Sequence, residues 1–167
     1  MSDLNSADAG AVVIRLSLTP DWPKADTVAI LAKTAASAAF AHADLSESAG
    51  IVAGELMENA IKYGDWSCTA NVTFSLLSHS DQLEIEVSSP CDSTSPHYQR
   101  LWASLRNIEK ANPRDSYLER LAQIAQDHNE RGGLGLLRLA HEANCRLSAR
   151  VADGERLHVR ASLPIPR

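Results

Sequence analysis

The stretch that decides the fold is Gly54-Glu55-Leu56-Met57-Glu58-Asn59-Ala60-Ile61-Lys62-Tyr63-Gly64. Drawn as a helix at about 100° per residue, it puts apolar residues on one side and Glu55, Asn59 and Lys62 along the adjoining side. Charged side chains at this spacing commonly lie on a solvated helix face. A carboxylate, an amide and an ammonium on one stripe also suit a metal-bound phosphate. Asn ligates Mg²⁺ through oxygen, Lys neutralises phosphate, and Glu orients or deprotonates a nucleophile.

Two further features favour the phosphate interpretation. Gly64-Asp65 closes the helix directly after Lys62, so the polar stripe lies in the last turns, where a site can open. A second glycine-rich stretch, Arg131-Gly132-Gly133-Leu134-Gly135-Leu136-Leu137, opens another helix about 70 residues later. Glycines at a helix N-terminus let backbone N–H groups approach a phosphate, although the same residues also suit a plain flexible turn.

These two stretches resemble the signature motifs of the GHKL ATP-binding superfamily, which includes histidine kinase-like ATPases. Glu55 to Tyr63 looks like the N-box, and Gly132-Gly133-Leu134-Gly135-Leu136 looks like the second glycine box. Within the superfamily, the chain is most similar to the anti-sigma-factor serine/threonine kinases of bacterial partner-switching systems. The resemblance extends over most of the chain from Val12 onward and implies a Bergerat fold.

The resemblance also implies a role for individual residues. Glu55 would be the general base, and Asn59 would ligate Mg²⁺ and bridge it to the phosphates of ATP. The other residues placed at the nucleotide are Lys62, Arg131, Gly133, Leu134, Gly135 and Ser89.

The first glycine box of the family departs most from its usual form. Ser89 stands where relatives carry the Asp that reads the adenine amino group, and no glycine follows in Ser88-Ser89-Pro90-Cys91-Asp92. A hydroxyl accepts a hydrogen bond from an amine more weakly than a carboxylate does. Pro90 also removes flexibility and a backbone donor. The phosphate side of the site is therefore more complete than the base side.

The functional expectation is an ATP–Mg²⁺-dependent signalling kinase that phosphorylates a small STAS-type antagonist protein. A sigma-like regulator is the other partner class, and a homodimer is possible. A second hypothesis is a degenerate GHKL module without nucleotide that sequesters its partner; the altered first glycine box favours it. A third is an unrelated α+β interaction domain.

Composition narrows the class of protein. The 167 residues fit one domain, with a tail over 1–11, the domain over 12–167 and a helical lid insert over about 89–131. A net charge of -5 argues against a nucleic-acid partner. No apolar run approaches the ~20 residues that span a bilayer. Three widely spaced cysteines indicate neither a disulfide framework nor a metal site, so a reducing cytoplasm is expected.

The order of the predicted elements gives the fold class. A strand over 12–18 precedes two helices, over 24–43 and about 46–63; two strands follow, over 68–77 and 83–87. After a loop from Ser88 to Pro96 and two insert helices come a helix at 134–143 and a final hairpin over 146–163. Strands joined by short turns form an antiparallel or mixed sheet. The prediction is an α+β two-layer sandwich with helices covering one face.

Overall fold

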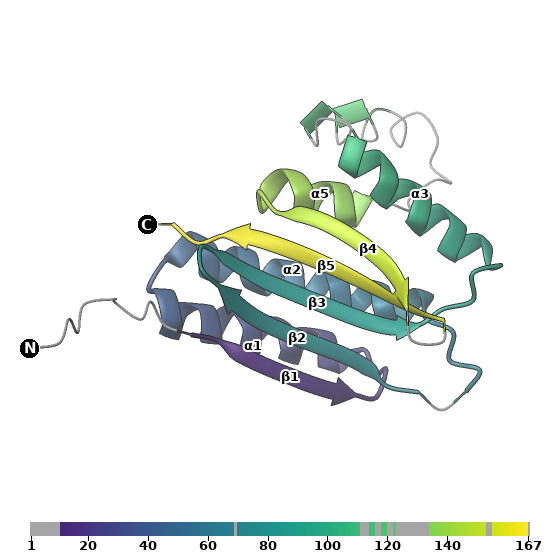
Figure 1. Cartoon of the computed structure of the whole chain (residues 1–167), viewed down its shortest axis with the longest axis horizontal. Helices are drawn as coiled ribbons and strands as arrows, with labels where there is room; N and C mark the ends of the chain where they lie inside the picture. Colours follow the sequence, from purple (N-terminus) through teal and green to yellow (C-terminus); the bar gives the residue numbers. More distant parts are fainter. Residues whose placement is uncertain are drawn as a thin grey trace, which may run out of the picture.

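The computed structural model describes residues 11–68, 70–110, 114–115, 118–119, 122, 134–152 and 155–166. Apart from residue 11, the predicted tail lies outside these residues, as does most of the second insert helix. The elements follow the predicted order (Figure 1): β1 (Val13–Leu18), α1 (Pro23–Phe40), α2 (Ala43–Tyr63), β2 (Val72–His79), β3 (Gln82–Pro90), α3 (Pro96–Lys110), α5 (Leu134–Glu142), β4 (Arg146–Ala152) and β5 (Arg156–Pro164).

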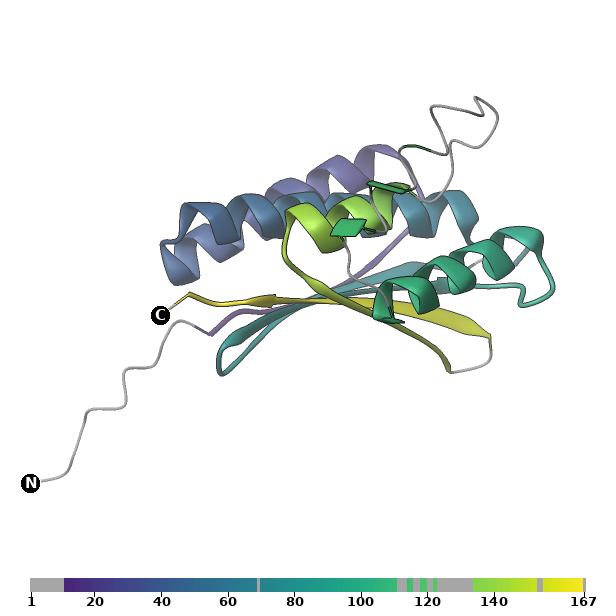
Figure 2. The ribbon, with the colours of Figure 1, turned by 90° about the horizontal axis from the view of Figure 1, so that it is seen from above.

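The five strands form one sheet in the order β1-β2-β3-β5-β4, and every neighbouring pair is antiparallel. Helices α1, α2 and α5 lie together over one face of the sheet, as the view from above shows (Figure 2). Helix α3 packs against β4 and α5. The predicted α+β two-layer sandwich is confirmed, and the sheet is purely antiparallel.

Alternation along the strands separates the core from the outer face of the sheet. Leu83, Ile85 and Val87 of β3 are buried, whereas Glu84 and Glu86 between them are partly exposed. Because successive strand residues point to opposite faces, the apolar set faces the helices and the charged set faces away from them. The core therefore lies between the sheet and the helical layer.

Small residues bring α1 and α2 close together. A Cβ on Gly50 would lie 3.2 Å from the Ala29 carbonyl oxygen, and one on Gly54 would lie 3.3 Å from the Ala29 Cβ. Ala25, Ala32 and Ala36 of α1 are likewise buried. This packing fixes α2 over the centre of the sheet and leaves the Glu55 side of α2 facing α5.

One part of the predicted architecture was wrong. Ser88 to Pro90 was expected to begin a loop, but β3 continues to Pro90, and these residues pair with His158 to Arg156 of β5. The Ser88 hydroxyl is hydrogen-bonded to Thr73 on the neighbouring strand, so the polar side chain is satisfied within the sheet. A serine-rich sequence thus extends a strand because residues of the neighbouring strands form hydrogen bonds with its hydroxyl group.

Within the part of the chain that the structure describes, no helix is both long enough and apolar enough to cross a bilayer.

Candidate functional site

The site is built around Glu55 and Asn59, which lie one turn apart on α2. The Asn59 side-chain amide donates a hydrogen bond of 3.5 Å to Glu55 Oε1. Both residues are partly buried. Two of the three residues of the predicted stripe, Glu55 and Asn59, are therefore in contact. The long hydrogen bond leaves the Asn59 amide oxygen for another partner.

Helix α5 places Gly135 against this pair. A Cβ built on Gly135 would overlap Glu55 Oε1, so a side chain at this position and the observed Glu55 carboxylate are mutually exclusive. Gly135 is the second residue of α5, which begins at Leu134. The structure therefore brings together the two motifs that the sequence separates by about 70 residues.

The surroundings of Glu55 raise the pKa of its carboxyl group. Burial raises the pKa of the Glu55 carboxyl above its usual range, and the neighbouring charge of Glu58 raises it further. Arg138, Asn59 and Lys62 lower it, but by less. A desolvated carboxylate with a raised pKa is a better proton acceptor near neutral pH than an exposed one.

Arg138 is a neighbour of Glu55 that the sequence analysis missed. It lies on α5 three residues after Gly135, so the helical period places the two on adjoining positions of one face. Arg138 also pairs with Glu142, with an Nε–Oε2 distance of 3.3 Å. The signal was present in the sequence as a cation one turn after the glycine box.

Within the described part of the chain, the structure does not bring the other predicted nucleotide-binding residues into contact with Glu55 and Asn59 in the same way. Lys62 is exposed, and its Nζ lies 5.0 Å from the centroid of the Tyr63 ring. Leu134 begins α5 directly before Gly135. Arg131 and Gly133 lie outside the described residues. The predicted phosphate contacts of Lys62, Arg131, Gly133 and Leu134 stay predictions.

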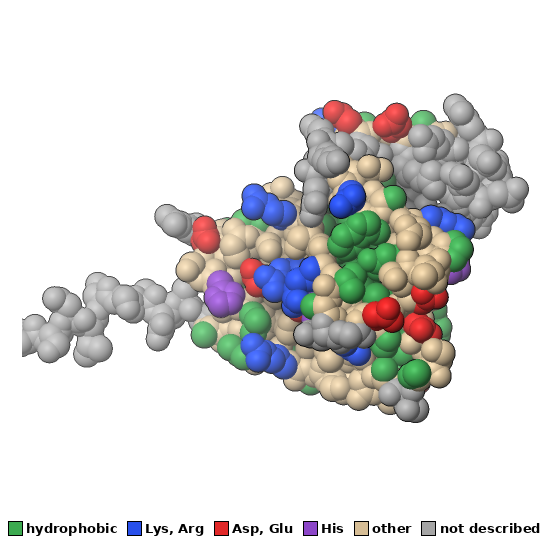
Figure 3. Space-filling view, turned by 45° about the vertical axis from the view of Figure 1, so that its right-hand side comes forward, with side chains coloured by type: hydrophobic (Ala, Val, Ile, Leu, Met, Phe, Trp, Pro, Cys, Tyr) green, Lys and Arg blue, Asp and Glu red, His purple; other side chains and the backbone are tan. Residues whose placement is uncertain are grey.

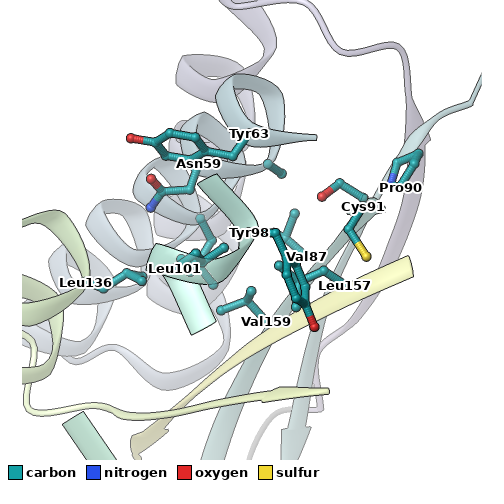
Figure 4. Close-up of a pocket in the computed structure, with 13 residues that line it drawn as sticks. Asn59, Tyr63, Val87, Pro90, Cys91, Tyr98, Leu101, Leu136, Leu157 and Val159 are labelled. Atoms are coloured by element: carbon teal, nitrogen blue, oxygen red, sulfur yellow. The ribbon is translucent and has the colours of Figure 1, made fainter. Parts of the chain in front are cut away.

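A narrow apolar cavity lies beside Asn59, between α2, the inner face of the sheet and α3 (Figure 4). Its volume is about 20 Å³, which is room for about one water molecule. Its lining is mostly apolar: Leu56, Asn59, Ala60, Tyr63, Val87, Ser89, Pro90, Cys91, Tyr98, Leu101, Leu136, Leu157 and Val159.

Ser89 occupies a defined place in this cavity. It is buried and is the next inward-facing residue of β3 after Val87, so it lies on the cavity wall together with Asn59. The extension of β3 therefore determines which way Ser89 faces. The prediction that Ser89 reads a base is not tested by this placement.

Side chains of α3 form part of the cavity wall. Tyr98 and Leu101 line the cavity from the α3 side (Figure 4). Tyr98 also stacks on Trp102, with ring centroids 6.0 Å apart. Neither Tyr98 nor Leu101 was predicted to belong to the site. Tyr98 falls three residues before Leu101 on the apolar stripe of α3, and that spacing was the available signal.

The side chains at this site supply few ligands for a metal ion. Among the described residues, no three His, Cys, Asp or Glu side chains cluster closely enough to hold an ion. Mg²⁺ in nucleotide sites typically takes one or two protein ligands and completes its octahedron with phosphate and water. The Asn59 amide oxygen beside the Glu55 carboxylate fits that limited role.

The fold resembles that of a solved protein structure. No family model and no curated protein matches the chain. Among solved structures, it is similar to a chain in the crystal structure of the SiaB–SiaC complex from Pseudomonas aeruginosa. The TM-score is 0.67, the sequence identity is 15%, and the match covers 93% of this chain and 90% of that chain. At this identity the likeness establishes a shared fold.

Proposed function

We propose that the chain is a signalling regulator that transfers phosphate from ATP–Mg²⁺ to a serine or threonine of a small partner protein. The observation that carries the proposal is the meeting of Glu55, Asn59 and Gly135 at the start of α5. The motif resemblance supports the nucleotide. The fold shared with a chain of the SiaB–SiaC complex supports a regulator that works through a protein partner, with a STAS-type antagonist as the specific expectation.

Each residue has a role that its surroundings suit. Glu55, whose pKa is raised mainly by burial, would take the proton of the attacking hydroxyl. Asn59 would hold Mg²⁺ through its amide oxygen, and the metal would neutralise charge on the phosphates. Gly135, having no side chain, leaves the Glu55 carboxylate in place beside the N-terminus of α5, whose backbone N–H groups favour an anion.

This function requires α3 to shift. Ligand sites of nucleotide size enclose about 300–1,000 Å³, whereas the cavity beside Asn59 has a volume of about 20 Å³. Tyr98 and Leu101 provide the obstruction, and both belong to one helix. A shift of α3 away from α2 would enlarge the cavity without breaking the sheet.

The small volume of the cavity also suits a second candidate function. A nucleotide-free module would keep α3 permanently packed in the cavity and would act by binding its partner alone. The small cavity volume and the replacement of the expected Asp by Ser89 favour it. The retained pair Glu55–Asn59 favours the kinase, because partner binding gives no reason to bury a carboxylate against a glycine.

Calorimetry of ATP binding, with and without Mg²⁺, separates the two functions. Saturable binding that needs Mg²⁺ supports the kinase, and γ-labelled ATP would then be used to follow transfer to candidate partners. If ATP does not bind at millimolar concentration to protein whose fold is verified by circular dichroism, the proposal is wrong and the nucleotide-free module replaces it.

A further inference from the structure

The outer face of the sheet carries charge of the opposite sign to the rest of the chain. Its charged strand residues are five arginines and two glutamates, an excess of three positive charges on a protein of net charge -5. Lys and Arg side chains gather over the middle of this region in a space-filling view (Figure 3). The residues are Arg15, Arg146, Arg150, Arg156, Arg160, Glu84 and Glu86.

The two glutamates hold part of this positive charge in a fixed network. Glu86 Oε2 accepts hydrogen bonds from Arg160 at 2.8 and 3.0 Å, and Glu86 Oε1 accepts one of 3.0 Å from His158 Nδ1. Arg160 also pairs with Glu84 at 3.5 Å. The network fixes the guanidinium of Arg160 on the sheet surface and so reduces the entropy cost of engaging it.

Two of the five arginines have no such anchor. Arg15 on β1 and Arg146 on β4 are exposed, and neither forms an ion pair with any residue that the structure describes. Val13, beside Arg15 on the same outer face, is an apolar side chain with 71% of its surface exposed. The face thus offers one unpaired cation beside exposed apolar surface on the edge strand β1 and a second unpaired cation on the opposite edge strand β4, a composition typical of interfaces.

The face is also hollowed. A groove of about 500 Å³ runs over β1, β2, β3 and β5, and Arg15, Ser75, Glu86 and Arg160 lie along it. Cross-strand register places the first three in one row, since Arg15 pairs with Ser75 and Ser75 with Glu86, and Arg160 follows beside Glu86. An ordinary solvated sheet face needs neither a hollow nor an excess of one charge.

From these observations we infer that the outer face of the sheet is a docking surface for a partner protein that presents an acidic segment with an apolar side chain beside it. Carboxylates of such a segment complement Arg15 and Arg146, and the apolar side chain covers Val13. Binding here is independent of the proposed kinase site, because Glu55 and Asn59 lie on the opposite side of the sheet.

Two other occupants fit the face less well. A second copy in two-fold symmetry would set the arginine excess against itself. A nucleic-acid backbone would offer phosphates to Arg15 but no aliphatic side chain to cover Val13.

The test uses the full chain, octaglutamate as the probe, and amide chemical shifts to map the contact. Saturable binding at low salt, weakened by added salt, is expected to shift amides of all five strands, including β4, which carries Arg146. Arg15→Glu and Arg146→Glu should each weaken binding about tenfold, equivalent to about 1.4 kcal/mol. Arg100→Glu reverses an exposed arginine on α3 and should change the affinity less than twofold.

Several results would contradict the proposed docking surface. Absence of saturable binding, shifts confined to another face, or equal losses in Arg100→Glu and Arg15→Glu would each overturn the inference. Tighter binding of an oligodeoxythymidine probe at the same amides would replace the protein partner with a nucleic acid. Circular dichroism of each variant verifies that it is folded, and Arg160 is left unchanged because its loss would unpair Glu86.

Discussion

The carboxylate of Glu55 occupies the space that a side chain at Gly135 would need. One residue comes from the middle of the chain and the other from the beginning of α5, and the site exists only where they meet. This contact explains why the second position of α5 carries glycine. The conflict involves the end of a flexible side chain, so a larger residue would displace Glu55 without disrupting the backbone.

Gly135→Ala is expected to leave the fold intact and to impair phosphoryl transfer. The methyl group moves the Glu55 carboxylate, while the gain in helix propensity, about 1 kcal/mol, offsets the strain. Thermal unfolding should shift by only a few degrees, and transfer should fall at least about tenfold. Gly54→Ala is the control, because a Cβ there faces Ala29 on α1 and leaves the Glu55 carboxylate untouched. Unchanged transfer in Gly135→Ala would show that the contact has no role in the reaction.

Asn59→Ala is expected to abolish Mg²⁺-dependent nucleotide binding. The one hydrogen bond lost is the 3.5 Å contact to Glu55, so little stability should be lost with it. Calorimetry with and without Mg²⁺ measures the effect, and Asn71→Ala on the exposed approach to β2 is the matched control. An unaltered ATP affinity in Asn59→Ala would refute the metal role.

The raised pKa of Glu55 gives the reaction a pH dependence. Only the ionised carboxylate can accept a proton, so transfer should rise with pH and reach half its maximum above the usual pKa of a glutamate. Glu55→Gln should keep its nucleotide affinity and lose transfer by at least about 100-fold. A rate profile over pH, with affinity measured at each point, tests this. A midpoint that persists in the glutamine variant would assign the titration to another group.

Leu101→Ala is expected to increase nucleotide affinity. Its side chain helps α3 to close the cavity, and apparent affinity scales with the fraction of molecules in the open state. The substitution should cost less stability than the ~2–5 kcal/mol typical of a fully buried leucine. Leu101→Ile conserves volume and should bind ATP as the parent chain does. Equal affinities in all three proteins would mean that α3 does not limit access.

Glu86→Gln is expected to change acid stability. Burial alone would raise the pKa of Glu86, but the hydrogen bonds from His158 and Arg160 outweigh it and hold the pKa below its usual range. Stability from this carboxylate is therefore complete above the unfolded-state pKa and is lost as pH falls through the lower folded-state pKa. Urea unfolding should show a deficit of about 1 kcal/mol at neutral pH, allowing for solvent screening, that vanishes in acid. Glu47→Gln removes a more exposed pair with Lys33 and should cost less.

Local pattern was sufficient to predict most of the elements. The 3.6-residue period of the Glu55 stretch, the alternation of Leu83 to Val87 and the glycine before α5 gave the order of helices and strands. These signals act over a few residues, so they can be read from sequence alone. The strand extension to Pro90 could not be predicted, because the hydroxyl of Ser88 is satisfied by Thr73 on another strand.

The sequence by itself determined the two motifs, the sandwich of helices on a sheet, and the side of α2 on which Glu55 and Asn59 lie. Only the tertiary structure decided that Gly135 meets Glu55, that Ser89 faces the cavity, and that Tyr98 and Leu101 line it. It also gathered arginines from three strands onto one face of the sheet. The physical reason is that side-chain periodicity is a property of one segment. Burial, cavity volume and charge balance depend on which segments pack together.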